Sequence, residues 1–80
     1  MITPEYTKAV DEYVDTFRSK NNFHEKSMHA LAIVAGSAEA NNIFGNSANA
    51  FKALTELVKK HSNEQELINE FFLMCKIKIK

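Results

Sequence analysis

The pattern of apolar and polar positions predicts a chain made of α-helices. Apolar residues recur at three- and four-residue intervals in four stretches, which is the spacing of one face of an α-helix. The connections between these stretches are short and polar, and the chain has one proline and two glycines. No stretch alternates apolar and polar residues for long enough to predict a sheet. The expected fold is therefore all-α, a small bundle of about four helices in a single domain spanning residues 1–80.

The second stretch, residues 27–38, differs from the others because it contains no charged residue. Apolar side chains occur on nearly all sides of a helix with this sequence, a pattern typical of a helix buried on most sides. We expect it to be the central helix of the bundle. A capping box at Asn22 predicts its start, and it is expected to end at Asn41 or Asn42, with Gly45 as the alternative end. The uncharged stretch is too short to cross a bilayer, which needs roughly 20 residues.

Three small residues within this predicted helix form a ridge without bulky side chains. Ala32, Gly36 and Ala40 recur every four residues and would lie on one line along the helix. A neighbouring backbone can approach such a ridge closely, which offsets the helix cost of a glycine, roughly 1 kcal/mol relative to alanine. We interpret the ridge as a packing groove. A ligand cleft over the same residues is the alternative.

The first and third helices carry their own start signals. Thr3 followed by a proline predicts the N-cap and first residue of a helix that ends near Lys20 or the next residue. Ser47 is the expected N-cap of the third helix, which runs to about Lys60 or His61. Residues 42–46 are expected to form the loop before it. The apolar face of the first helix comprises Tyr6, Ala9, Val10, Tyr13, Val14 and Phe17.

The fourth helix carries more apolar surface than one face can hold. It is expected to begin after a capping box at Ser62 or, in the alternative register, at Asn63. The predicted core-facing side comprises Leu67, Ile68, Phe71, Phe72, Met74 and Cys75. Two further apolar residues fall outside that side and are flanked by charges, which is typical of an interface, although enclosure by the same chain is the alternative. The candidate interface consists of Leu73, Ile77, Glu66, Glu70 and Lys76.

The composition narrows the classes of function. Ten basic residues balance ten acidic ones, for a formal net charge of zero. A dominant phosphate-binding role usually makes a domain strongly basic, so this balance disfavours nucleic acid as the main partner. Cys75 is the only cysteine, which excludes a disulfide within the chain and a cysteine ligand set. The first residues do not resemble a signal peptide, so we expect a cytoplasmic protein, of cellular or phage origin.

No residue pattern in the sequence predicts catalysis or a metal site. His24, Glu25 and His29 are close together, but two ligands on one turn are not a site, since catalytic zinc has three protein ligands. Cys75 lies among apolar residues, where a thiol behaves as a small hydrophobe with a raised pKa. The two glycines are too far apart for a glycine-rich phosphate loop. We therefore expect no enzyme activity, no cofactor and no catalytic or metal-binding residues.

The size of the chain favours function by contact. A domain this small has limited burial and often gains stability by association. We expect a non-enzymatic interaction protein, such as a regulator, inhibitor or adaptor, that contacts a protein partner or forms a homodimer. One alternative is a DNA-associated regulator that uses the third helix, with Lys52, Lys59 and Lys60, and the basic C-terminal tail. The other is a small-ligand-binding protein with its cleft at Ala32 and Gly36.

Overall fold

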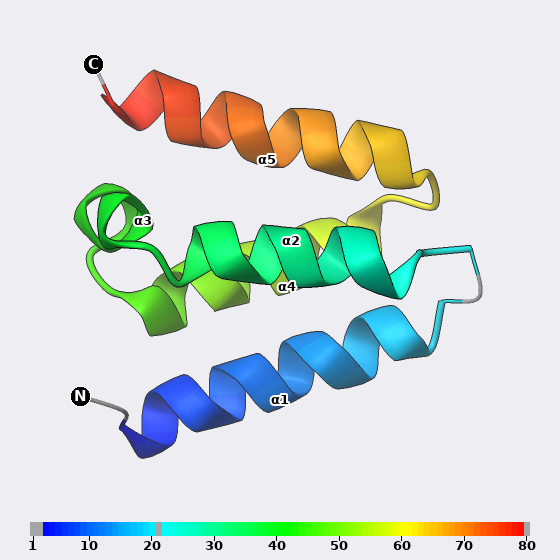
Figure 1. The fold of residues 1–80 in the computed structure, drawn as a ribbon, viewed down its shortest axis with the longest axis horizontal. Helices are drawn as coiled ribbons and strands as arrows, with labels where there is room; N and C mark the ends of the chain where they lie inside the picture. Colours follow the sequence, from blue (N-terminus) through cyan, green and yellow to red (C-terminus); the bar gives the residue numbers. More distant parts are fainter. Residues whose placement is uncertain (1–2, 21, 80) are drawn as a thin grey trace.

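The computed structural model describes residues 3–20 and 22–79, with side chains described as far as Cys75. This part of the chain contains five α-helices and no strand (Figure 1). The helices are α1 (Pro4–Arg18), α2 (Glu25–Ala35), α3 (Ala38–Phe44), α4 (Ser47–Lys60) and α5 (Glu64–Ile79). The all-α prediction is confirmed, with five helices in place of about four.

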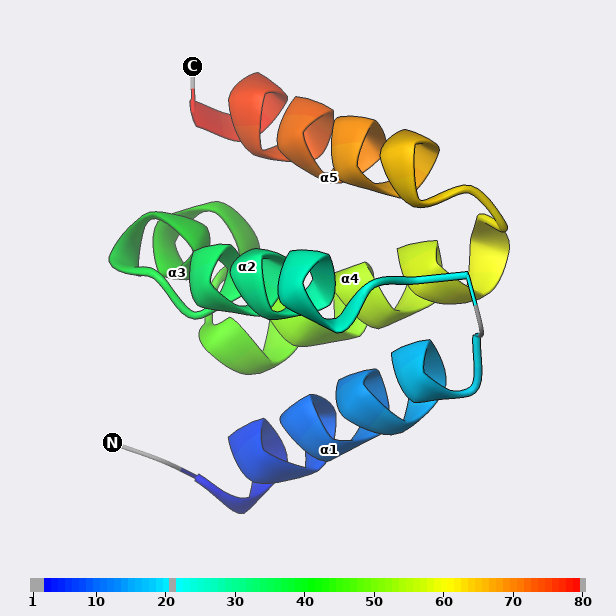
Figure 2. The ribbon, with the colours of Figure 1, turned by 45° about the vertical axis from the view of Figure 1, so that its right-hand side comes forward.

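Helix α4 is the centre of the bundle, because it contacts each of the other four helices. Both ribbon views place α1 and α5 on opposite sides of α2 and α4 (Figures 1 and 2). Helix α4 buries residues along its whole length, from Ala48 to Val58. The prediction that residues 27–38 form the central helix, buried on most sides, is therefore wrong. The outward side of α2 carries His29, Ala30 and Ile33, so the absence of charge in this stretch does not mark burial.

The expected second helix is in fact two helices, broken at Gly36 and Ser37. The Ser37 hydroxyl donates a hydrogen bond to the Val34 carbonyl at 2.7 Å and accepts one from the Ala40 backbone N–H at 3.2 Å. A serine that satisfies both helix ends competes with the continuous helical backbone. The prediction of one helix through Asn41 or Asn42 is therefore wrong. The alternative end holds for α3, whose C-cap is Gly45.

Three of the predicted start signals are close to the observed ones. Thr3 caps α1 as predicted, since its Oγ1 accepts a hydrogen bond from the Tyr6 backbone N–H at 3.1 Å. Helix α4 is capped by Asn46, whose side chain accepts from a backbone N–H, so the predicted cap Ser47 is the first helical residue and the loop expected over residues 42–46 shrinks to residues 45–46. For α5 the alternative register is correct, with Asn63 as the capping side chain.

Helix α5 holds the start of α2 in place of the predicted capping box. The N-cap residue of α2 is His24, and its side chain makes no capping hydrogen bond. The carboxylate of Glu64, at the start of α5, accepts the His24 backbone N–H at 2.6 Å. Asn22, the residue predicted to open the capping box, instead donates its side-chain amide to the Ser62 carbonyl. These contacts tie the loop before α2 to the loop before α5.

Helix α5 packs on the bundle through one side only. Leu67 and Phe71 are fully buried, and Phe71 stacks on Phe44 of α3 with ring centroids 6.3 Å apart. Phe72, predicted to face the core, is 47% exposed, and Leu73 is 56% exposed. The core-facing prediction is wrong for Phe72 because α5 contacts only α3 and α4 appreciably, which cover a narrower side than the apolar residues occupy. The backbone of α5 remains helical to Ile79.

Candidate functional site

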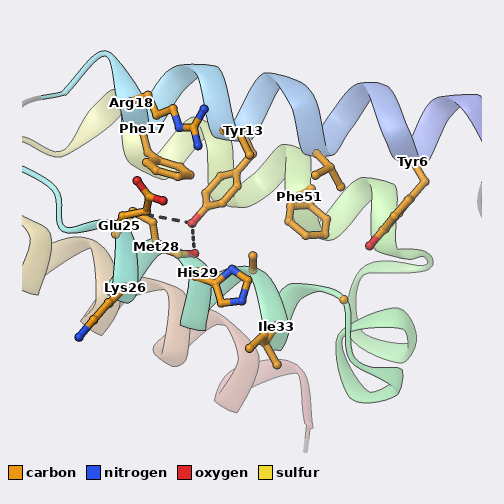
Figure 3. A pocket seen from close by; sticks show the side chains of 14 residues that line it. Tyr6, Tyr13, Phe17, Arg18, Glu25, Lys26, Met28, His29, Ile33 and Phe51 are labelled. Carbon is orange, nitrogen blue, oxygen red and sulfur yellow. Dashed lines mark hydrogen bonds between the residues drawn. The ribbon is translucent and has the colours of Figure 1, made fainter.

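A groove of about 930 Å³ separates α1 from α2, with α4 beneath it (Figure 3). Its residues come from both helices, from Gly36 at the C-cap of α2 and from Phe51 of α4. The two helices run in opposite directions, so Arg18 at the end of α1 lies near Glu25 at the start of α2, and Tyr6 lies near Gly36. We call this feature the α1–α2 groove.

The floor of the α1–α2 groove is a row of aromatic rings. The Phe51 ring lies between those of Tyr6 and Tyr13, with centroid distances of 5.7 and 5.6 Å, and both pairs meet edge to face. Phe17 follows, with its ring centroid 5.2 Å from that of Tyr13. Edge-to-face and tilted aromatic pairs add attraction beyond the burial of their area. The row therefore forms a firm apolar base that connects α1 to α4.

The Tyr13 hydroxyl crosses the floor and links α1 to α2. It donates a hydrogen bond to the Met28 carbonyl at 2.6 Å and lies 3.7 Å from the Met28 sulfur (Figure 3). Burial raises the pKa of Tyr13 well above its ordinary value of 10.0, so the phenol stays neutral. A neutral, buried and bonded hydroxyl is a structural bridge and not an acid–base group. It fixes the separation between the two walls of the groove.

The walls of the groove are apolar and only partly covered. Val10 and Val14 on α1 and Ala32 on α2 are half-buried, while Ile33 on the α2 rim is 64% exposed. A large apolar side chain that remains in solvent beside an apolar groove marks a surface suited to binding. The groove therefore offers apolar contact from its floor to its rim.

Charged and polar side chains gather at one end of the groove, beside the loop between the helices. Arg18, Glu25, Lys26 and His29 are all exposed there. Among the described side chains, none of the ion pairs involves Arg18, Glu25 or Lys26. Two cations and one carboxylate thus lie at this end of the groove.

The structure brings together two of the three small residues predicted to form a groove. Ala32 and Gly36 line the α1–α2 groove, but Ala40 is buried in α3, because the helix is broken between them. A Cβ added to Gly36 would lie 3.5 Å from the Ala32 carbonyl oxygen and 3.7 Å from the Tyr6 hydroxyl. These are ordinary contacts, so no neighbouring helix backbone packs against Gly36. The continuous ridge is therefore not present.

The candidate interface on α5 is partly exposed and partly engaged within the chain. Leu73 and Glu66 are exposed. Glu70 is engaged, since its carboxylate lies 2.7 Å from His61 Nε2 and 3.5 Å from Lys60 Nζ. The side chains of the remaining two predicted residues, Lys76 and Ile77, lie outside the described residues.

The lysines considered for DNA binding each lie beside a carboxylate. Lys52 Nζ is 3.3 Å from Glu5, Lys59 Nζ is 3.7 Å from Glu56, and Lys60 pairs with Glu70. Exposed pairs such as these contribute little to stability, but they neutralise the local charge that a phosphate backbone would need. The three lysines therefore do not form an uncompensated basic surface.

Other chemistry is sparse in the described part of the chain. No three of its His, Cys, Asp and Glu side chains are grouped so that they could hold a metal ion. Cys75 is half-buried, and burial together with the Glu39 carboxylate raises the pKa of its thiol. Of the helices described, none has the length and apolar character needed to cross a membrane. No protein-family model, curated protein or solved structure matches the chain significantly.

The sequence did not reveal which side chains of α1 face the groove. Tyr6, Val10 and Val14 belong to the predicted apolar face of the first helix, and in the structure they are half-buried and line the groove. Their four-residue spacing sets them on one flank of a wide apolar face, while Ala9, Tyr13 and Phe17 occupy the buried flank. An apolar face wider than one neighbouring helix can cover was the available signal.

Proposed function

We propose that this protein is a non-enzymatic interaction protein that binds an apolar helix of a partner in the α1–α2 groove. The observation that supports the proposal is the groove itself, with its aromatic floor and the exposed Ile33 on its rim. Laying the apolar face of an amphipathic helix into a hydrophobic groove is a recurrent mode of recognition. The α1 wall from Tyr6 to Phe17 is about 16 Å long, which corresponds to roughly three turns of a bound helix.

A small apolar ligand is the second candidate occupant. The groove volume of about 930 Å³ lies within the range of small-molecule sites, and a few polar groups gather at one end of an apolar lining. The DNA-associated alternative has less support, because Lys52, Lys59 and Lys60 lie beside carboxylates. We favour the helix because the lining residues run along α1 from Tyr6 to Arg18 and along α2 from Glu25 to Ile33.

Affinity capture with matched variants tests the proposal. Ile33→Glu places a charge on the groove rim, and Ala30→Glu places the same charge on an exposed position of α2 that does not line the groove. We expect a partner held by the wild type and by Ala30→Glu to be depleted at least about tenfold with Ile33→Glu, because binding would bury the new charge. Equal capture by all three baits would rule out the groove. A small molecule seen by native mass spectrometry on wild type alone would favour the second candidate.

A further inference from the structure

We propose that α5 of a second copy of this chain occupies the α1–α2 groove, laid parallel to α2. This inference rests on the proposed function of the groove and names its occupant. Three observations carry it: the distribution of exposed apolar side chains, the matching spacing of residues on α2 and α5, and the charges at one end of the groove.

The exposed apolar side chains divide between the groove and α5. In the part of the chain that the structure describes, the large hydrophobic residues classed as exposed are Ile33, Phe72 and Leu73. Ile33 stands on the groove rim, and the other two stand on α5. Contact between α5 of one copy and the groove of another covers Ile33 and Leu73 together. A contact between two α5 helices, the arrangement closest to the sequence-based expectation, leaves Ile33 in solvent.

The residues of α2 and α5 that would meet have the same spacing. Positions i, i+3 and i+7 lie along one side of an α-helix, and two turns rise about 10.5 Å. On α2 these positions run from Lys26 to Ile33, and on α5 they run from Glu66 to Leu73. A parallel arrangement therefore forms three pairs with one offset in sequence: Lys26 with Glu66, His29 with Asn69, and Ile33 with Leu73.

Each of these pairs is chemically complementary. Ile33 and Leu73 are both apolar, and His29 and Asn69 can share a hydrogen bond. Lys26 has no ion pair among the described side chains, and Glu66 is 70% exposed even though one of its oxygens lies 3.6 Å from His61 Nδ1. The Glu66 carboxylate of the incoming helix would also approach Arg18. It adds a second carboxylate to an end of the groove that has two cations and one carboxylate, so the charges there balance. An antiparallel arrangement would bring Glu66 to the apolar end of the groove instead.

This contact joins two different surfaces, so its symmetry differs from that of a simple dimer. A dimer held by one such contact keeps a free groove on one copy and a free α5 on the other. Head-to-tail contacts of this kind build closed rings or open chains. Wild-type protein is therefore expected to form species whose size grows with concentration, or a ring of fixed size.

A complementation experiment tests this arrangement. Ile33→Glu disables the groove and leaves α5 intact, whereas Leu73→Glu disables α5 and leaves the groove intact. Both residues are exposed, so circular dichroism should show wild-type helix content in each. At tens of micromolar in analytical ultracentrifugation we expect each variant alone to be monomeric and their equimolar mixture to form a dimer that grows no further. The wild type should assemble beyond that dimer or form a ring.

A charge exchange tests the parallel orientation. Lys26→Glu and Glu66→Lys should each weaken wild-type assembly by a factor of about two to five, the range expected for a pair at the rim of an interface. The two changes in one chain should restore it, because each contact then pairs the reversed charges. Assembly by the double variant that is no stronger than that of either single variant would overturn the parallel register.

The other outcomes separate this inference from the proposed function. A monomeric wild type, or a mixture of the two variants that stays monomeric, overturns the inference. Assembly that survives Ile33→Glu but not Leu73→Glu would show an α5–α5 contact and overturns it too. If the wild type is monomeric yet captures a partner that Ile33→Glu loses, the groove keeps its proposed function and only α5 is excluded as its occupant.

Discussion

Two glycines lie at helix ends in this chain, and their backbones make opposite demands on a side chain. Gly45 closes α3 with φ of 93°, a conformation that other residues rarely adopt, whereas Gly36 has φ of −88° and room for a Cβ. We expect Gly45→Ala to lower the free energy of unfolding by about 1–3 kcal/mol. Gly36→Ala should raise it by about 0.4–1 kcal/mol, through the reduced freedom of the unfolded chain. Urea denaturation measures both changes. A lower free energy of unfolding for Gly36→Ala would show that neighbouring atoms leave no room for the added methyl group.

The Tyr13 hydroxyl gives a second prediction at the scale of one residue. Tyr13→Phe should lower the free energy of unfolding by about 0.5–1.5 kcal/mol, because the hydrogen bond to the Met28 carbonyl is lost. Burial raises the pKa of the folded tyrosine above its unfolded value near 10, so the wild type loses stability as the pH rises above about 10. Tyr13→Phe removes this part of the alkaline loss. Tyr6→Phe, a half-buried tyrosine of the same groove, is the matched control in the urea titrations.

Glu64 connects two helices, and this makes the start of α2 sensitive to acid. Partial burial raises the pKa of Glu64, but hydrogen bonds from the His24 backbone, the Ser27 hydroxyl and the His24 ring outweigh burial and hold that pKa below 4.5. A carboxylate whose pKa is lower in the folded than in the unfolded state stabilises the protein at pH values above its unfolded-state pKa. This stabilisation is lost as the pH falls through the folded-state pKa. We expect Glu64→Gln to lower the melting temperature at pH 7 and to flatten its fall below about pH 5.

The control for this prediction is Glu56→Gln. Its carboxylate is exposed and pairs with Lys59 on the same helix, so the substitution removes one charge without touching the start of α2. Thermal melts followed by circular dichroism from neutral to acid pH compare the two variants. A melting temperature of Glu64→Gln that follows the wild type at every pH would contradict the capping role of Glu64.

At the scale of elements, the sequence predicts what is local and misses what depends on neighbours. Thr3 and Asn63 cap their helices through atoms within three residues, so their signals are visible in the chain itself. The start of α2 depends on Glu64, which is distant in sequence, and no local pattern reports such a contact. The break at Ser37 had a local signal, a serine after a glycine, but the uncharged run around it favoured a continuous helix.

The whole molecule is built around α4, so the two sides of α2 should respond differently to the same substitution. Leu31 is buried, and Ile33 on the same helix is exposed. Leu31→Asp should unfold the domain, because it places an unpaired charge in the core, at a cost of more than about 4 kcal/mol. Ile33→Asp should change the free energy of unfolding by less than about 0.5 kcal/mol. Circular dichroism and thermal melting measure the loss of stability in both variants. Equal losses would contradict the observed orientation of α2.

The candidate site was predictable only in part, for reasons that belong to the whole molecule. Ala32 and Gly36 suggested a place where no bulky side chain stands, and they do line the groove. Val10 and Val14 form the α1 side of the groove. The sequence could not assign them to it, because the angle between α1 and α2 decides which flank of α1 is covered. That angle is set by Tyr13 and by the packing of both helices on α4.

The packing of α1 on α4 also sets the order in which the chain can fold on the ribosome. Residues 4–18 are synthesised first, but their main packing partner, residues 47–60, is made only after α2 and α3. Domains fold as units during synthesis, and contacts between distant segments form late. A nascent chain halted at Gly45 therefore displays Tyr13 and Phe17 to the solvent. The aromatic floor of the finished groove is, in the growing chain, an exposed segment that a chaperone can bind.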